Sequence, residues 1–314
     1  MLNQNENQPG IHLLSGAEFS IDELTAAYNQ TRVDYLVPMP MNAQRLAAYV
    51  QVYDVDLPGS LVALEESGAH EASGAVEPGA QQAGPRGEML GLAMLGLRPD
   101  HIWVTRLGVL PVRRRRGTGE ALVRGLLEAG ERRGIRRAIL EVIKGNVAAH
   151  SLFLKLGFVE TRELLVMRRP PAAPQAAPQG QPEWLAAPEA VALLASANLG
   201  LGCDQPLGLA WTNEVASFTN APDTQALRVD LGARGRGWLV FRRQRFVLSH
   251  FVFQTEAGDP AEVGAALLGQ LYFRHPLQDT YIENIAVSDP HCAALAQFGC
   301  LEVFRRVEMV REAA

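Results

Sequence analysis

A glycine-containing turn flanked by arginines is the part of this sequence whose residue types and spacing best suit chemistry. It follows an apolar strand, opens a helix, and consists of Arg114, Arg115, Arg116, Gly117, Thr118 and Gly119. The first backbone N–H groups of a helix have no acceptor within the helix, and glycine lets the backbone turn sharply and approach a ligand closely. The helix dipole and the arginines add positive potential, so the pattern predicts a site for a phosphate or pyrophosphate. The alternative is a solvated helix start with a purely structural role.

A second segment downstream combines a carboxylate with a short apolar helix. Glu141 lies in a predicted buried strand, residues 138–143, and a predicted helix follows Asn146 and ends at Gly157. The apolar positions of that helix share one face at helical spacing, and they are Ala149, Leu152, Phe153 and Leu156. The same positions also fit an ordinary helix core. His150 falls off this face, as a surface histidine does.

The two segments together resemble the cofactor-binding motifs of the GNAT superfamily of N-acetyltransferases. The family's pyrophosphate loop, Arg/Gln-x-x-Gly-x-Gly/Ala, is matched by Arg114, Gly117 and Gly119. The preceding strand, residues 107–111, is similar to the family's bulged strand, whose exposed backbone groups bind the pantetheine arm. Residues 146–158 match the family's second motif in the right order and distance downstream. The detailed resemblance covers residues 20–169.

The resemblance implies acetyl-CoA as a co-substrate, no metal, and direct attack of an amine on the acetyl thioester. Binding both substrates in one cleft would supply proximity, which can be the largest catalytic effect. The implied cofactor-binding residues are Leu107, Val109, Arg114, Arg115, Arg116, Gly117, Thr118, Gly119, Glu120, Asn146 and Phe153. The N–H of Val109 is the candidate for polarising the thioester carbonyl, and Glu141 is the candidate base, directly or through water. The alternative for Glu141 is a paired structural glutamate, because Glu283 occupies the equivalent place in the second half.

The sequence departs from the family at Phe153, which stands where a tyrosine usually protonates the departing thiolate. A phenyl ring cannot donate a proton, so either water or another residue supplies the proton, or no proton is needed. The last alternative is open because a thiol pKa of roughly 8.5 makes the thiolate a moderately good leaving group. Tyr35 is a candidate substitute and, alternatively, a packing residue. Two rival functions stay open beside acetyl transfer. One is a non-catalytic acyl-CoA sensor or structural protein with a vestigial site, and the other is transfer of a longer acyl group.

The amino-terminal helices, predicted after Ser20 and after Asn42, wall the acceptor site in this superfamily. Their aromatic and sulfur-containing side chains would line an apolar pocket, and these are Tyr35, Met39, Met41, Tyr49 and Tyr53. Asp54 and Asp56 could attract a cationic amine. Helix core and a solvated turn are the alternatives for these residues. The implied partner is a small-molecule or peptide amine. A protein N-terminus, a lysine, an aminoglycoside, a polyamine and a small metabolite are all possible acceptors. The sequence does not specify the oligomeric state.

Composition and charge narrow the class of protein. The chain has 314 residues, of which 47% are hydrophobic and 20% charged, and this suits two globular domains. A net charge of −5 argues against a nucleic-acid binder, which needs an excess of Lys and Arg. Three cysteines without metal-ligand spacing argue against a disulfide framework or a zinc site and favour a reducing compartment. The chain shows neither a signal-peptide pattern nor an apolar run long enough for a membrane span, so we expect a cytoplasmic enzyme.

Two domains and a linker are predicted from the course of the chain. Residues 1–170 form a catalytic domain, the Pro/Ala/Gln-rich residues 171–183 a linker, and residues 184–314 a second GNAT-like domain. The predicted fold class is α/β, with each domain a mixed, mostly antiparallel sheet flanked by helices. Residues 66–88, rich in Gly, Ala, Ser and Pro, are predicted to form a loop without regular structure.

The second half repeats the first at a constant offset, which indicates duplication. Adding 142 to the residue number converts Glu141, Gly157 and Met167 into Glu283, Gly299 and Met309. The same offset converts Gly117, Thr118 and Gly119 into Asp259, Pro260 and Ala261, and Arg114 into Glu256. Acidic residues repel phosphate, and proline lacks an N–H donor. The second domain is therefore predicted to lack the cofactor site, so that the chain binds one acetyl-CoA.

Overall fold

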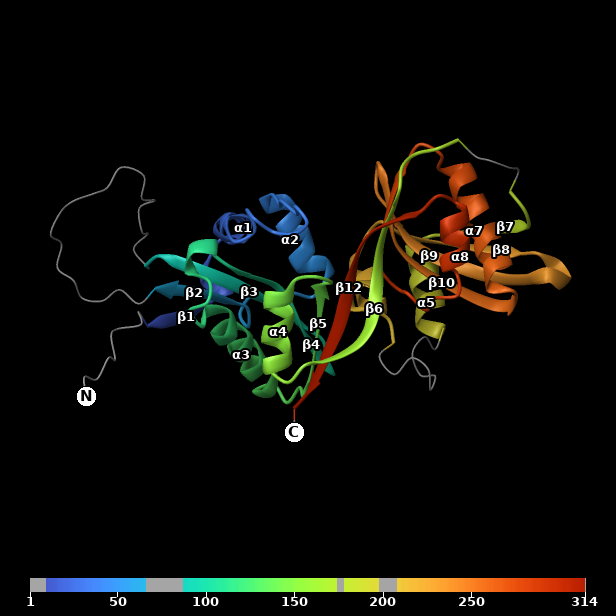
Figure 1. Cartoon of the computed structure of the whole chain (residues 1–314). Coiled ribbons are helices and arrows are strands. Elements are labelled where there is room, and N and C mark those ends of the chain that lie inside the picture. Colours follow the sequence, from blue (N-terminus) through green and yellow to red (C-terminus); the bar gives the residue numbers. More distant parts are fainter. Residues whose placement is uncertain (1–9, 66–86, 174–177, 198–207, 314) are drawn as a thin grey trace, which may run out of the picture. The chain divides into compact units, whose positions relative to one another are not determined.

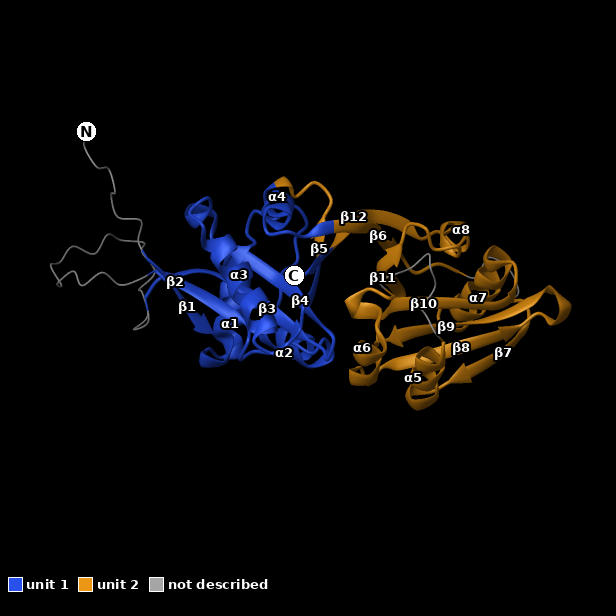
Figure 2. Ribbon diagram, turned by 90° about the horizontal axis from the view of Figure 1, so that it is seen from below, with its two compact units in different colours: residues 1–140, 148–159, 310–314 blue, residues 141–147, 160–309 orange. Residues whose placement is uncertain are grey.

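The computed structural model describes residues 10–65, 87–173, 178–197 and 208–313. The chain divides into two compact units, which we describe one at a time (Figure 2). The first unit contains residues 1–140, 148–159 and 310–314, and the second contains residues 141–147 and 160–309. Most of the predicted loop, residues 66–86, lies outside the described residues, as do residues 174–177 of the predicted linker.

In the first unit the strands follow one another in space as they do in the sequence. The order β1-β2-β3-β4-β5 comprises β1 (Ile11–Ser15), β2 (Leu61–Glu65), β3 (Met89–Leu97), β4 (His101–Val109) and β5 (Arg137–Ile143). Neighbours are antiparallel from β1 to β4, and β5 is parallel to β4. The nearly continuous apolar run of β3 fits a strand that is buried on both faces.

Helices cover both faces of this sheet. Figure 1 shows α1 (Ile21–Gln30) and α2 (Ala43–Val52) on one face, and α3 (Thr118–Glu131) and α4 (Val147–Lys155) on the other. The predicted helix starts of α1 and α2 are confirmed. The Ser20 side chain accepts from the N–H of Glu23, the Glu23 carboxylate accepts from the N–H of Ser20, and Asn42 accepts from the N–H of Arg45.

The pairing between β4 and β5 is short. Only residues 101–103 of β4 pair with β5, and their partners are residues 137–139. Beyond this point Arg106 takes a left-handed φ of 54°, and the register between β3 and β4 shifts, which defines a β-bulge. The predicted bulged strand is confirmed, and the ladder to β5 ends before β4 reaches residues 107–109.

The second unit repeats this plan. Its strands have the order β12-β6-β11-β10-β9-β8-β7 and are β6 (Val159–Arg169), β7 (Gln181–Leu185), β8 (Thr224–Asp230), β9 (Gly235–Arg243), β10 (Val247–Gly258), β11 (Asp279–Ala286) and β12 (Leu301–Glu312). β10 and β11 are parallel and pair only at the residues 247–249 of β10, after which His250 takes a φ of 56°. This is the counterpart of the short β4–β5 pairing. The predicted fold class, α/β with mixed, mostly antiparallel strands flanked by helices in each unit, is confirmed, whereas the strands are all assigned to one twelve-stranded sheet.

Two apolar cores lie on opposite faces of the second sheet. The helices of this unit are α5 (Ala187–Ser196), α6 (Val215–Asn220), α7 (Pro260–Arg274) and α8 (Cys292–Gln297). Trp238 and Val240 of β9 belong to the core under α5, whereas Leu239 and Phe241 belong to the core under α7. Alternate residues of a strand point to opposite faces, so β9 contributes to both cores.

The compact units are not contiguous stretches of chain, and in this they differ from a single division after residue 170. β6 pairs with β11 and belongs to the second unit from residue 160 onward, whereas residues 310–314 belong to the first unit. There Ala313 donates its N–H to the carbonyl of Arg136 (2.7 Å), and the Arg311 guanidinium lies 3.2 Å from the Glu131 carboxylate. In addition, β7 begins at Gln181, inside the predicted linker.

Candidate active site

The amino-terminal end of α3 presents open backbone donors. Its N-cap residue, Gly117, has a φ of 85° and makes no side-chain capping bond. A Cβ on Gly117 would meet no atom within 4 Å, so the space beside the turn is open. Residues other than glycine rarely adopt a backbone conformation with such a positive φ. The glycine therefore provides both the turn and an unobstructed approach to the first N–H groups of the helix, which an anion can occupy.

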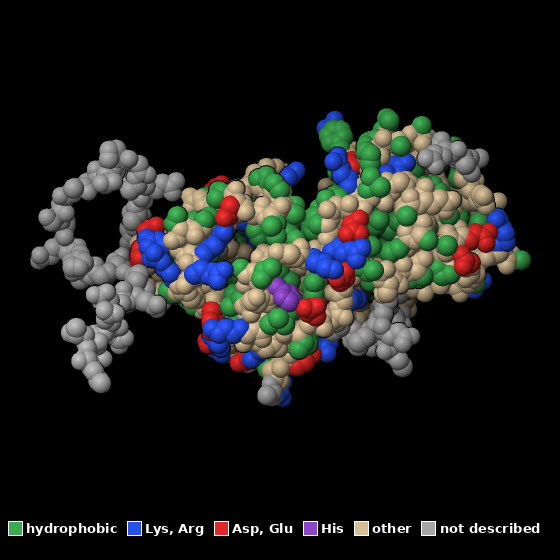
Figure 3. Space-filling model, viewed as in Figure 1, with side chains coloured by type: hydrophobic (Ala, Val, Ile, Leu, Met, Phe, Trp, Pro, Cys, Tyr) green, Lys and Arg blue, Asp and Glu red, His purple; other side chains and the backbone are tan. Residues whose placement is uncertain are grey.

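Two of the arginines before Gly117, Arg113 and Arg114, form ion pairs with carboxylates of the protein. Arg113 binds the carboxylates of Glu65 (2.8 Å) and Glu88. Arg114 forms a bidentate pair with Asp34 at 2.7 Å for both contacts, and its hydrogen bonds lower the pKa of that carboxyl. Figure 3 shows the corresponding pattern, with Lys and Arg side chains beside Asp and Glu side chains on the first unit.

Arg115 and Arg116 are the arginines of the turn that remain available to a ligand. Both are exposed, and neither has an ion-pair partner among the described residues. Thr118 is buried at 3% exposure, so it contributes a backbone donor rather than an accessible side chain. The Glu120 carboxylate is bound by Arg124 (2.8 Å) and Lys155 (2.5 Å), whose hydrogen bonds lower its pKa.

The end of β4 supplies the second part of the site. Leu110 donates its N–H to the carbonyl of Leu90 on β3 (2.9 Å). Adjacent residues of a strand direct their backbone groups to opposite edges, so Val109 directs its N–H away from β3, toward the edge where pairing with β5 has ended. The carbonyl of Leu107 accepts a hydrogen bond from Arg32 (3.1 Å). The carbonyl of Val109 accepts from the Nε of Arg114 (3.2 Å), so the N–H of Val109 is the backbone group of this residue that points toward the edge beyond the β5 pairing.

α4 lies against this region through its apolar side chains. A Cβ on Gly119 would lie 3.4 Å from Leu152 Cδ2 and 3.7 Å from Val109 Cγ2, so these residues converge on one spot. Phe153 is buried at 5% exposure and packs edge-to-face on Phe158, with the ring centroids 5.9 Å apart. Phe153 is therefore part of the packed core around α4, and a phenyl ring there offers no proton.

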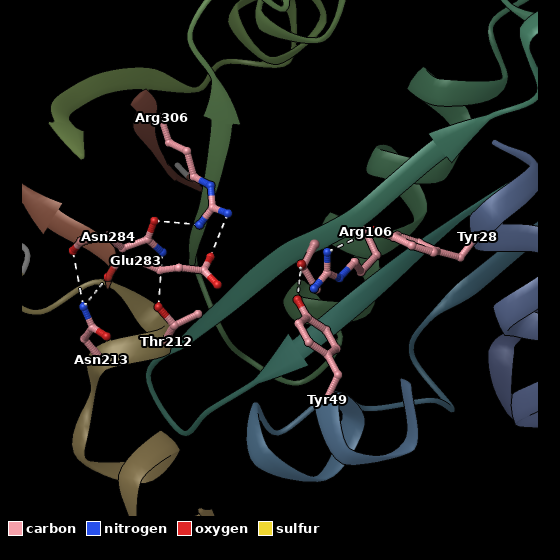
Figure 4. A network of polar contacts seen from close by, with 9 residues as sticks. Tyr28, Tyr49, Arg106, Thr212, Asn213, Glu283, Asn284 and Arg306 are labelled. Atoms are coloured by element: carbon pink, nitrogen blue, oxygen red, sulfur yellow. Dashed lines mark hydrogen bonds and ion pairs between the residues drawn. The ribbon is translucent and has the colours of Figure 1, made fainter. Parts of the chain in front are cut away.

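Glu141 and Asn146 fall in the second compact unit, with residues 141–147. Burial disfavours the charge of Arg306, but the carboxylates of Glu283 and Glu141 raise the pKa of this guanidinium above its ordinary value. Arg306 also donates to Glu283 (2.8 Å) and to the side chain of Asn284 (2.7 Å), as Figure 4 shows. Arg306 of the second unit is thus influenced by the carboxylates of both Glu283 and Glu141.

At the equivalent place in the second unit, the helix start is closed. β10 runs to Gly258, and the next residue, Asp259, is the N-cap of α7, so the long arginine-rich turn has no counterpart. One carboxylate oxygen of Asp259 accepts from the N–H of Ala261 and of Glu262, both at 3.0 Å. The donors that an anion would use are therefore occupied by the protein itself.

The gap beyond the short β10–β11 pairing is filled as well. His291 is 3% exposed, stacks on Phe253 at 4.9 Å between ring centroids, and is bonded to Thr255 (2.9 Å) and Asp289 (2.8 Å). By the sequence offset, His291 takes the place of Ala149, so a bulky imidazole replaces a methyl group. This arrangement supports the prediction that the second half holds no acetyl-CoA.

Comparison with known proteins places this geometry in a family. The model of the acetyltransferase (GNAT) family matches residues 43–158, which include β4, the arginine-rich turn, α3 and α4. Residues 43–158 belong to the GNAT family. The match indicates acyl transfer in general, and GNAT proteins use acetyl-CoA as a co-substrate. Among curated proteins, no sequence matches the chain.

Solved acetyltransferase structures, one of them a tandem GNAT protein, share the fold along nearly the whole chain. A GCN5-related N-acetyltransferase from Sphaerobacter thermophilus is 14% identical, with a TM-score of 0.63 over 96% of this chain and 95% of that one. The tandem GNAT protein from the clavulanic acid biosynthesis pathway is 14% identical, with a TM-score of 0.59 over 97% and 99%. A third, from Anabaena variabilis, is 13% identical, with a TM-score of 0.56 over 96% and 73%. At such identities the likeness concerns the fold.

Within the described residues, no group of three or more His, Cys, Asp or Glu side chains is placed to hold a metal ion. The helices within the same residues are all too short or too polar to cross a membrane.

Proposed function

We propose that the first half of the chain transfers an acetyl group from acetyl-CoA to a primary amine by direct attack. The observation that carries this proposal is the open start of α3 at Gly117, together with the end of β4, where pairing with β5 has stopped and the Val109 N–H points away from β3. The donors at the helix start and the exposed Arg115 and Arg116 would hold the pyrophosphate. The edge of β4 would hold the pantetheine arm as an added strand.

The residues of the chain would act on the reaction as follows. The N–H of Val109 would donate to the thioester oxygen, whose negative charge grows as the amine attacks. A C–N bond forms, the C–S bond breaks, and the amine loses a proton to Glu141, directly or through water. Since Phe153 cannot donate, the thiolate would leave as such or take its proton from water. We propose that the protein works in the cytoplasm, where acetyl-CoA and free thiols occur together.

A second function, acyl-CoA binding without turnover, is favoured by one observation. Phe153 is buried against Phe158 and leaves the family's usual proton donor unreplaced at that position. A sensor of this kind would bind acetyl-CoA but would not consume it.

Thiol release from acetyl-CoA in the presence of primary amines distinguishes the two functions. We expect release that depends on both the protein and the amine, and that is multiple-turnover. The panel should contain amino acids, peptides, polyamines and aminoglycosides, with heat-denatured protein as the control. Tight acetyl-CoA binding without release for any amine would contradict acetyl transfer and favour the sensor.

A further inference from the structure

We infer that the second unit of the chain docks on an anionic membrane surface. The surface that would dock combines exposed apolar side chains with arginines, and we call it the apolar–basic patch. Its members are Phe246, Phe273, Leu277, Arg243, Arg245 and Arg274. The inference goes beyond the proposed function and does not depend on it, because the patch contains no residue of the candidate active site.

Two turns meet at one end of the second unit and carry the patch. One joins β9 to β10, and the other joins the end of α7 to β11. The Gln278 side chain of the second turn donates to the carbonyls of Gln244 (2.6 Å) and Arg245 (3.3 Å) in the first. The N–H of Asp279 donates to the carbonyl of Phe246 (2.9 Å). Since α7 also packs over β9 and β10 through the apolar core beneath it (Figure 1), the members of the patch gather at one end of this unit.

Three large apolar side chains of the patch are exposed to water. Phe246 is 68% exposed, Leu277 is 85% exposed, and Phe273, in the last turn of α7, is 55% exposed. Single exposed apolar residues are common, but several of them on neighbouring segments mark an interaction surface. Phe246 and Leu277 lie on turns, so their side chains can enter the headgroup layer of a membrane while the strands and the helix behind them stay in water.

Three arginines accompany these apolar side chains. Arg243, Arg245 and Arg274 are exposed, and among the described residues none of them forms an ion pair. The Arg245 guanidinium lies over the Phe246 ring, 5.0 Å from its centroid, and that of Arg274 lies over the Trp184 ring at 4.2 Å. Stacking on a ring leaves the N–H groups at the edge of a guanidinium available to an anion.

The carboxylates that border the patch do not neutralise it. Residues 242–255 and 263–278 contain no Asp or Glu. Asp223, Asp279 and Glu183, on the neighbouring segments, are each paired with an arginine outside the patch, at 2.8, 2.8 and 3.6 Å. The patch is therefore positive, although the chain as a whole carries a net charge of −5.

An anionic membrane surface is the partner that satisfies both kinds of side chain. Apolar side chains leave water at the boundary of the acyl chains, and arginines bind the phosphates of the headgroups in pairs of hydrogen bonds. A second copy of the chain in a symmetric dimer would place the patch on the same patch of its partner, so the arginines of both copies would repel each other. A soluble polyanion would bind the arginines but leave the phenyl rings in water.

Sedimentation of the full chain with lipid vesicles tests the inference. The vesicles contain phosphatidylglycerol and phosphatidylcholine in equal parts, and vesicles of phosphatidylcholine alone are the comparison. We expect binding at least about tenfold stronger to the anionic vesicles, because each arginine near such a surface adds to the affinity. Added salt should weaken this binding by screening the charges.

Variants of the patch show whether it carries the binding. Arg245→Gln should lower the affinity about fivefold, the effect of one arginine near an anionic surface, and Arg245→Lys should keep it. Phe246→Ser combined with Leu277→Ser should lower it at least about tenfold. These side chains are exposed, so we expect unchanged thermal melting.

Two matched changes outside the patch are the controls. Arg236→Gln removes an exposed arginine at the opposite end of β9, and Leu301→Ser removes an apolar side chain that is 69% exposed in the same unit. Both should leave vesicle binding unchanged. Thiol release from acetyl-CoA should be the same in all these variants, because the patch lies outside the candidate active site.

Three results would overturn the inference while leaving acetyl transfer in place. The first is no preference for anionic vesicles, or binding that the changes in the patch do not lower. The second is binding that soluble polyglutamate abolishes and that Phe246→Ser with Leu277→Ser leaves intact, which would show a site for polyanions in general. The third is a dimer in sedimentation velocity that Phe246→Ser dissociates, which would show that the patch joins two copies of the chain.

Discussion

Gly119→Glu is expected to abolish acetyl-CoA binding while the first unit stays folded. The new Cβ would make ordinary contacts, 3.4 Å from Leu152 and 3.7 Å from Val109, so the position tolerates a side chain. A glutamate in the first turn of α3 interacts favourably with the helix dipole, so the helix itself is not weakened. Its carboxylate would, however, meet the phosphates at the open helix start. Like charges brought together in this way cost several kcal/mol, which corresponds to a loss of more than about a hundredfold in affinity.

Gly119→Ala is the matched control for this change. It adds the Cβ without the charge, so we expect its affinity for acetyl-CoA to stay within about tenfold of the natural protein, a difference of 1.4 kcal/mol. Calorimetric titration gives both affinities, and thermal melting shows whether the fold is kept. Unchanged affinity in Gly119→Glu would refute the placement of the cofactor at α3.

Arg162→Ala is expected to lower the free energy of unfolding much more than the loss of a surface ion pair does. Glu308 is 2% exposed, and Arg162 holds its carboxylate through Nε at 2.7 Å and Nη2 at 3.1 Å. Removing the guanidinium leaves a buried carboxylate without its cation, which typically costs about 3–5 kcal/mol of the free energy of unfolding. Arg162 also donates to the carbonyl of Gly208 (2.8 Å), and this bond would be lost with it.

Arg168→Ala on the same strand is the control, because it breaks an ion pair of similar geometry at the surface. Arg168 and Asp279 are 2.8 Å apart, with side-chain exposures of 58% and 28%, so the loss should stay below about 1 kcal/mol. Denaturant unfolding followed by tryptophan fluorescence measures both losses, because three of the four tryptophans, Trp184, Trp211 and Trp238, lie in this unit and Trp103 lies in the other. Replacing both partners, Arg162→Met with Glu308→Leu, should recover much of the loss. An Arg162→Ala loss no greater than that of Arg168→Ala would contradict this role of the pair.

The sequence predicts the elements of this fold well because their signals are local. The capping box at Ser20 and the Asn42 cap mark α1 and α2, and the continuous apolar run at residues 238–241 of β9 reflects a strand between two cores. Strand order is a different matter. Nothing within β6 or at the end of β12 specifies which sheet edge the segment joins, so the division of the chain into units, with residues 310–314 in the first, emerges only from tertiary structure.

The candidate site shows the same division between local and long-range signals. The need for glycine at position 117 is a local property of the turn, and the left-handed φ agrees with it. The motif around Arg114 predicts that its side chain binds the cofactor. In the structure this side chain pairs with Asp34, which is far away in the sequence, so the motif alone does not predict its partner. The contacts of the Arg32 and Arg106 guanidinium groups with the Tyr28 ring join residues 28–32 to β4, so no local pattern in the sequence predicts them.

The central claim is that one chain holds one acetyl-CoA, in its first half. Titration of the intact protein with acetyl-CoA in a calorimeter measures this directly. We predict a stoichiometry of one per chain, which disappears in Gly119→Glu and is unchanged when the α7 cap is replaced by Asp259→Asn. Two equivalent sites per chain, or a single site that persists in Gly119→Glu and is altered by Asp259→Asn, would contradict the claim.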